Sequence, residues 1–111
     1  MRNIPQISAK SWAVFDAGKM SFMHGKREYL KRECASLTKI MTCYTAIMLC
    51  REWKISPKTT EITVSAIASD IRGTSAHLET GDTLSIDQLL YGLMLPSGND
   101  AAFALAQYFG K

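Results

Sequence analysis

The longest regular pattern of apolar positions in this sequence runs from Ala35 to Cys50. Large apolar residues recur there at i, i+3, i+4, i+7, i+10 and i+11, which predicts an α-helix; they are Leu37, Ile40, Met41, Tyr44, Ile47 and Met48. The other side carries small or apolar residues, namely Ala35, Cys43, Ala46 and Cys50. A helix that is apolar all round is expected to be buried on most of its faces.

The C-terminal third predicts two further helices. The first begins after Ser85, because Ser85 and Gln88 have the spacing of a capping box. Its apolar face would consist of Ile86, Leu89, Leu90, Leu93 and Met94, and Pro96 follows its end. A last helix is predicted from Ala101 to Phe109, with Asp100 as its cap and Gly110 as its stop.

Shorter stretches predict strands. Residues 11–16 (SWAVFD) and 20–24 (MSFMH) flank a Gly-containing turn, which is typical of a β-hairpin. An extended piece is expected at residues 61–65, and residues 71–85 are rich in turn formers, including Gly73 and Gly81. These elements predict an α+β fold in one domain, residues 1–111.

The composition fits a packed globular protein, with 47% hydrophobic residues and a net charge of +3 over 111 residues. The basic excess is local, at residues 25–33 (GKREYLKRE), where acids interrupt the bases. We therefore expect no nucleic-acid partner. No run is long and apolar enough for a transmembrane segment. Residues 1–10 lack an apolar core and a cleavage site, so no secretory signal is expected.

The three cysteines, Cys34, Cys43 and Cys50, are an odd number. Cys43 and Cys50 would lie two helical turns apart, roughly 10 Å, which is too far for a disulfide. Reduced, buried thiols are expected, and they favour an intracellular compartment. Neither His24 nor His77 has a partner at ligand spacing, and no Gly-rich phosphate loop is present, so neither a metal nor a cofactor is predicted.

Ser36 and Lys39 are the first candidates for chemistry. Ser-x-x-Lys occurs by chance in chains of this length, but here the lysine falls in the first turn of an apolar helix. The positive end of the helix dipole disfavours a cation there by about 0.3–1 kcal/mol, and desolvation acts in the same direction. A neutral amine three residues from a hydroxyl can act as a general base for a nucleophile.

A second candidate group precedes the last helix. Ser97, Gly98 and Asn99 are ordinary turn and cap residues when taken alone. Beside Ser36 and Lys39, the Ser97 hydroxyl could relay a proton, and the Asn99 amide could hold a substrate amide while contacting the lysine.

The stretches ASLTKIMT and, some sixty residues later, LMLPSGNDAA resemble the first two signatures of the penicillin-binding, active-site-serine enzymes. The likeness is greatest to D-alanyl-D-alanine carboxypeptidases of the peptidase S11 type, and it extends over nearly the whole chain. It implies a β-lactamase/DD-peptidase-like α+β fold. It also implies that Ser36 is the acylated nucleophile, Lys39 the base, and Ser97 with Asn99 the pair that relays protons and holds a peptide substrate or β-lactam.

The family's third signature, Lys-Thr-Gly on a later strand, is not found in these 111 residues. Residues 58–60 (KTT) lie between the first two motifs and are not followed by glycine. In relatives that strand supplies the second oxyanion donor, whose loss costs about 10²–10³ in rate. The fold is therefore expected to be truncated, with the hairpin left as a two-stranded ribbon that needs a protein partner to cover it.

Three functional hypotheses follow. The chain is part of a serine-type carboxypeptidase, or a non-catalytic remnant that acts as a structural subunit of a larger assembly, or a β-lactamase-like hydrolase. The predicted reduced thiols favour an intracellular location, whereas bacterial relatives are periplasmic or extracellular, so the compartment stays open.

Overall fold

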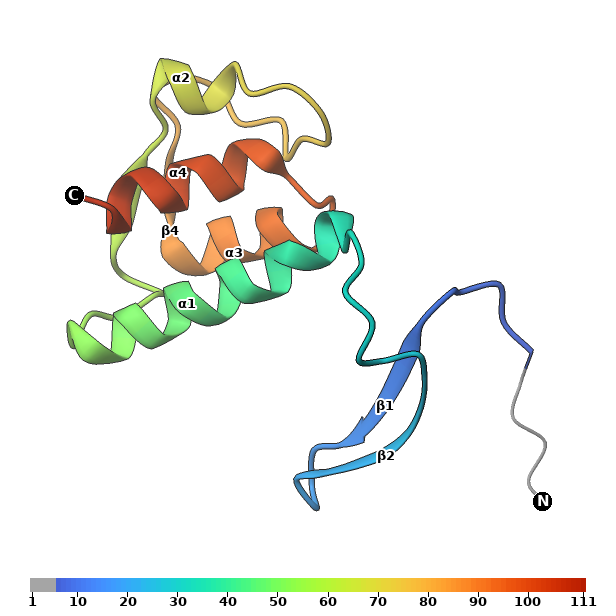
Figure 1. Ribbon diagram of the computed structural model, residues 1–111. Helices are drawn as coiled ribbons and strands as arrows, with labels where there is room; N and C mark the ends of the chain where they lie inside the picture. The colour runs from blue at the N-terminus through green and yellow to red at the C-terminus, as the bar shows by residue number, and fades with distance from the viewer. Residues whose placement is uncertain (1–5) are drawn as a thin grey trace. The chain divides into compact units, whose positions relative to one another are not determined.

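The computed structural model describes residues 6–111, which divide between Glu33 and Cys34 into two compact parts (Figure 1). The first five residues belong to the segment that is predicted to lack a secretory signal, and they lie outside the described residues. The α+β class predicted from the sequence is confirmed.

The first part contains the predicted β-hairpin. Strand β1 (Trp12–Asp16) pairs antiparallel with β2 (Ser21–Lys26), and the register shifts between Val14 and Phe15. The turn is closed by the backbone N–H of Lys19, which donates to Oδ1 of Asp16 over 2.9 Å. The apolar side chains of this ribbon are about half exposed: Val14, Phe15, Phe22 and Met23.

The second part is a cluster of helices beside a small sheet. Helices α1 (Thr38–Glu52), α3 (Ile86–Met94) and α4 (Asn99–Phe109) contact one another, and the short α2 (Ala66–Ser69) packs on α4 (Figure 1). Strands β3 (Glu61–Thr63) and β4 (Thr83–Ser85) pair antiparallel. The largest fully buried apolar side chains are Ile86, Leu89, Leu93, Leu105 and Val64.

The capping box of α3 is present as predicted. The backbone N–H of Gln88 donates to Oγ of Ser85 over 3.1 Å, and the backbone N–H of Ser85 donates to Oε1 of Gln88 over 2.9 Å. This reciprocal pair satisfies two donors that a helix start otherwise leaves without partners. Helix α3 therefore begins where the local sequence specifies.

The expected burial of α1 is wrong. Only Ala46 and Cys50 of this helix are buried, whereas Ile40, Met41 and Tyr44 are 55–62% exposed. The small residues face the other helices because they let the backbones approach closely. The larger apolar residues then remain on the outer face of the helix.

The predicted cap of the last helix is also wrong. Helix α4 already begins at Asn99, so Asp100 lies inside the helix, and Gly98 is the N-cap without a side-chain hydrogen bond. The Asp100 carboxylate instead accepts hydrogen bonds from residues 75–78, a loop distant in sequence. Gly110 ends the helix as predicted.

The cysteines differ in their surroundings. Cys50 is buried, and this burial raises the pKa of its thiol. Cys43 is half-buried, but Cys34 is exposed, contrary to the expectation of three buried thiols, and its Sγ lies 3.3 Å from Oγ1 of Thr38. All three are free thiols. Among the described helices, none combines the length and apolar character that a bilayer crossing requires.

Candidate active site

The first motif lies at the junction of two helical segments. Ser36 belongs to the 3₁₀ turn η1 (Ala35–Leu37), which leads directly into α1, and Lys39 is the second residue of α1. Ser36 is exposed and Lys39 is half-buried. Their side chains lie on the same side of the chain, with Nζ of Lys39 3.4 Å from Oγ of Ser36.

The second motif reaches the same lysine from 60 residues away. Nζ of Lys39 donates to Oδ1 of Asn99 over 2.7 Å, which joins the start of α1 to the start of α4. The amide of Asn99 is held on its other side, because Nδ2 donates to the backbone carbonyl of Arg72 over 3.0 Å. The tertiary structure thus brings three of the four predicted site residues into hydrogen-bond contact.

Ser97 is the fourth predicted residue, and it borders a pocket that Ser36 and Lys39 also line. This pocket has a volume of about 400 Å³, and among its other lining residues are Cys34 and Met94. The Oγ of Ser97 is shielded from solvent, and it has no hydrogen-bond partner within residues 6–111. The backbone of Ser97 is left-handed, with φ of +58°.

A buried hydrogen-bond donor that lacks an acceptor is unusual, because leaving it unpaired costs about 1–3 kcal/mol. Such groups are found where a ligand or a reacting group completes the pairing. The Ser97 hydroxyl is therefore the buried polar group of this region that the described residues leave unpaired. Ser36 and Lys39 line the same pocket as Ser97.

Asp100, which directly follows Asn99, is the residue beside the site that the sequence analysis placed in the wrong structural role. Its side chain is 1% exposed and accepts hydrogen bonds from the backbone N–H groups of Ala76, Leu78 and Ala101 and from the Ser75 hydroxyl. Burial by itself raises the pKa of this carboxyl, but the hydrogen bonds outweigh burial and hold the pKa below its ordinary value of 3.8. The only feature of the sequence that could have indicated this buried position is the acidic residue directly after Ser-Gly-Asn.

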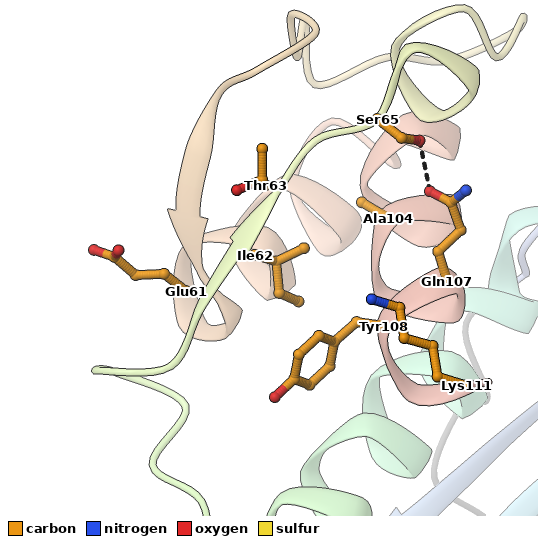
Figure 2. Close-up of a pocket in the computed structure, with 8 residues that line it drawn as sticks. All are labelled: Glu61, Ile62, Thr63, Ser65, Ala104, Gln107, Tyr108 and Lys111. Carbon is orange, nitrogen blue, oxygen red and sulfur yellow. Dashed lines mark hydrogen bonds between the residues drawn. The ribbon is translucent and has the colours of Figure 1, made fainter.

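A separate pocket of about 350 Å³ lies between β3 and α4 (Figure 2). Its polar groups include Ser65, whose hydroxyl donates to Oε1 of Gln107 over 2.7 Å. None of Ser36, Lys39, Ser97 and Asn99 lines this pocket. The chemistry predicted from the sequence is therefore concentrated where the start of α1 meets the start of α4.

The arrangement of these helices defines the class of the protein. Its fold is that of the DD-peptidases and β-lactamases: a crystal structure of the carboxypeptidase DacD from Francisella tularensis matches 96% of this chain with a TM-score of 0.84 at 32% identity. The S216A mutant of the Streptomyces K15 DD-transpeptidase matches 97% of it with a TM-score of 0.82 at 35% identity.

Within that class, the chain belongs to the peptidase S11 family of D-alanyl-D-alanine carboxypeptidases, whose family model matches residues 1–110. The curated carboxypeptidase of Streptomyces sp. strain K15 is 36% identical over 111 aligned positions, and the alignment covers 96% of this chain. DacD of Escherichia coli K12 is also 36% identical, over 94% of this chain.

The chain is much shorter than these relatives. The match spans 37% of the Streptomyces enzyme, 28% of Escherichia coli DacD and 25% of the Francisella structure. The matched segment contains both motifs described above.

Proposed function

We propose that this chain carries the acylation machinery of a serine-type D-alanyl-D-alanine carboxypeptidase. In this proposal Ser36 is the nucleophile, Lys39 the general base, Ser97 a proton relay and Asn99 a substrate-holding residue. The observation that carries the proposal is the position of Nζ of Lys39, within 3.4 Å of Oγ of Ser36 and 2.7 Å of Oδ1 of Asn99.

The first step of the proposed reaction forms an ester. Oγ of Ser36 attacks the carbonyl carbon of the amide between the two D-alanines, and its proton moves to a neutral Lys39 amine. The Nζ–Oγ distance is long for proton transfer, but such contacts commonly tighten when substrate binds. The backbone N–H of Ser36, at the start of a helix, is one candidate donor to the oxyanion.

The second step breaks the amide. The proton passes from Lys39 through the Ser97 hydroxyl to the leaving amine, the C–N bond breaks and D-alanine departs. Water then attacks the ester carbonyl while Lys39 takes a proton from it, the bond between the acyl carbon and Oγ of Ser36 breaks, and the proton returns from Lys39 to Oγ of Ser36. The shielded and unpaired Oγ of Ser97 supports its role as a relay, because a substrate amine would supply the missing partner.

The spacing of the motifs also supports these assignments. The solved structures of the Streptomyces K15 transpeptidase include one variant of a lysine and others of a cysteine that lies 60 positions after it. Lys39 and Asn99 have the same separation here. Asparagine is one of the residues introduced in place of that cysteine.

The test is covalent labelling with a fluorescent penicillin. We expect an adduct with the mass of the whole reagent on the peptide that contains Ser36, because the amine released when a β-lactam ring opens stays attached to the acyl group. Ser36→Ala should abolish labelling, and Lys39→Ala should slow it by at least about 10²-fold. Ser56→Ala, at an exposed serine in a loop, is the matched control and should label normally.

Two outcomes would redirect the proposal. A folded chain that forms no adduct argues against acylation by this chain. Rapid turnover of the penicillin, with ring-opened product released and no adduct accumulating, would instead indicate the β-lactamase-like alternative. Release of D-alanine from a synthetic D-alanyl-D-alanine peptide would identify the carboxypeptidase reaction itself.

A second candidate function is that of a structural subunit. It is supported by the exposed outer face of α1, where Ile40, Met41 and Tyr44 are each more than half exposed. A soluble monomer rarely leaves such a continuous apolar stripe uncovered. Under this hypothesis a polypeptide that supplies the remaining strands of the carboxypeptidase fold covers the stripe, and the motifs contribute to the assembly without acylation by this chain alone.

A further inference from the structure

The loop of residues 72–78 wraps around the second motif on the side away from Lys39. Its backbone carbonyls accept from Asn99 twice: Arg72 from Nδ2 over 3.0 Å, and Thr74 from the backbone N–H over 2.8 Å. The hydroxyl of Thr74 donates to the backbone carbonyl of Ser97. Asn99 is therefore held between this loop and the lysine amine.

Asp100 is the anchor of that loop. It is the only buried charged residue in the part of the chain that the structure describes. Its Oδ1 and Oδ2 together accept from three donors on the loop, namely the Ser75 hydroxyl and the backbone N–H groups of Ala76 and Leu78, over 2.9–3.1 Å. A carboxylate can accept all of these at once, whereas an amide of the same size cannot.

The loop approaches Asn99 too closely to tolerate a side chain at its tip. Gly73 has φ of +101°, and a Cβ built there would lie 2.5 Å from Nδ2 of Asn99. The close approach is required for the hydrogen bond from Nδ2 to Arg72, because Arg72 directly precedes Gly73. The geometry of the loop is thus coupled directly to the position of the amide that contacts Lys39.

We infer that Asp100 is a positioning residue for acylation, because it fixes the 72–78 loop that sets the Asn99 amide against the Lys39 amine. The inference rests on the proposed function for its catalytic consequence, although the positioning itself is a structural property. Asp100 touches neither Ser36 nor Lys39 in this arrangement, and it acts only through the loop and its neighbour Asn99.

Two substitutions with matched controls test this inference. Asp100→Asn keeps the size of the side chain but turns an NH₂ group towards donors, and its control is Asp82→Asn, which changes a loop carboxylate that accepts from the backbone N–H of Glu79. Gly73→Ala places a methyl group against Asn99. Its control is Gly81→Ala, which has a similar φ of +92° and no atom within 4 Å of the added Cβ.

The first readout is competitive acetylation of Lys39, with the exposed Lys58 of the same chain as the internal reference. We expect Asp100→Asn and Gly73→Ala to raise the Lys39-to-Lys58 ratio by about tenfold, because both weaken the part-buried hydrogen bond from Lys39 to Asn99. Asp82→Asn and Gly81→Ala should leave the ratio unchanged. This readout requires no enzymatic activity.

The second readout is penicillin acylation as a function of concentration. Loss of positioning should lower the limiting rate by about tenfold and change the half-saturating concentration little, because the loop does not line the pocket. If the unaltered chain is not acylated at all, the proposed function fails. The acetylation ratio then still tests whether Asp100 positions the Asn99 amide against Lys39.

The inference would be overturned if the ratio of Lys39 to Lys58 acetylation were the same in the two variants as in their controls. Circular dichroism must first show that all four chains are folded. Should Asp100→Asn fail to fold, Ser75→Ala takes its place, because it removes a single donor to the same carboxylate. A Lys39 ratio in Ser75→Ala that equals the ratio in the unaltered chain would then overturn it.

Discussion

Asp100 combines deep burial with full hydrogen bonding, and this combination decides its protonation. An isolated buried carboxylate would be expelled or protonated, because its charge is costly away from water. Here the backbone N–H groups of Ala76, Leu78 and Ala101, with the Ser75 hydroxyl, replace the hydration that burial removes. The ionised form is therefore the one that the folded chain stabilises.

This gives a pH dependence of stability with a definite sign. The pKa of Asp100 is lower in the folded chain than its ordinary value of 3.8, so the contribution of this group is present above pH 3.8 and is lost as the pH falls through the folded pKa. We expect the unfolding free energy of the unaltered chain to exceed that of Asp100→Asn by a margin that is constant near neutral pH and shrinks below pH 3.8.

Urea unfolding at several pH values from neutral down to below the ordinary pKa measures this margin. Asp82→Asn, whose carboxylate lies in the same loop region, controls for the general loss of negative charge. A margin that grows as the pH falls would contradict the assigned direction of the shift.

At the scale of the element, α1 shows that an apolar helix can have two unequal faces. Its inner face is made of small residues such as Ala46 and Cys50, which lie at most 3% exposed. Its outer face contains the larger side chains, including Ile40 at 55% exposure. The stability of the helix within residues 34–111 should therefore depend on the smaller side chains and on the helices beneath them.

Two isoleucine substitutions compare these environments with the same chemical change. Ile86→Ala, at a fully buried position in α3, should lower the unfolding free energy by about 2–5 kcal/mol, because it removes buried methyl groups and leaves a cavity. Ile40→Ala should cost about 0.5 kcal/mol, which is typical of an exposed site. Chemical denaturation measures both, and equal losses would contradict the exposure of the outer face.

At the scale of the whole molecule, both compact parts present apolar surface. The hairpin exposes Phe15 and Phe22, and the helical part exposes the outer face of α1. The relatives are more than twice as long as this chain, since it spans 37% and 28% of two of them. Under the structural-subunit hypothesis, further polypeptide would cover this apolar surface.

If the outer face of α1 is a surface for further polypeptide, the isolated chain should associate with itself and bind a hydrophobic dye. We expect the double variant Met41→Gln/Tyr44→Gln to reduce self-association and dye binding, because these two residues are 62% and 59% exposed on one face of α1. Ile67→Gln with Tyr91→Gln is the matched control, at 62% exposure each but on different helices.

Sedimentation velocity and dye fluorescence at a series of concentrations provide the measurement. The control pair should leave association unchanged. A monomeric chain that melts cooperatively would count against the structural-subunit hypothesis, as would equal effects of the two pairs.

The sequence by itself determined the features that depend on neighbours along the chain. Apolar spacing located α1, the Ser85–Gln88 box located α3, and β-forming residues around a glycine turn located the hairpin. The two motifs and their order also indicated the family, because they are short stretches whose residues can be read directly. These features could be predicted because helix periodicity, capping and turn formation are local interactions.

Only the tertiary structure decided which groups meet. It turned the small side of α1 inward and bonded the Asp100 carboxylate to the 72–78 loop instead of to a helix cap. The contact between Lys39 and Asn99, which the second motif predicted, is made by packing across 60 residues. Strand β4 and helix α2 also escaped prediction; β4 ends a stretch whose turn formers favoured a loop, and the four residues of α2 are too few to show a helical period. Packing between distant segments selects among faces and partners that the local pattern leaves equivalent, and that choice is made by close approach and by the pairing of buried polar groups.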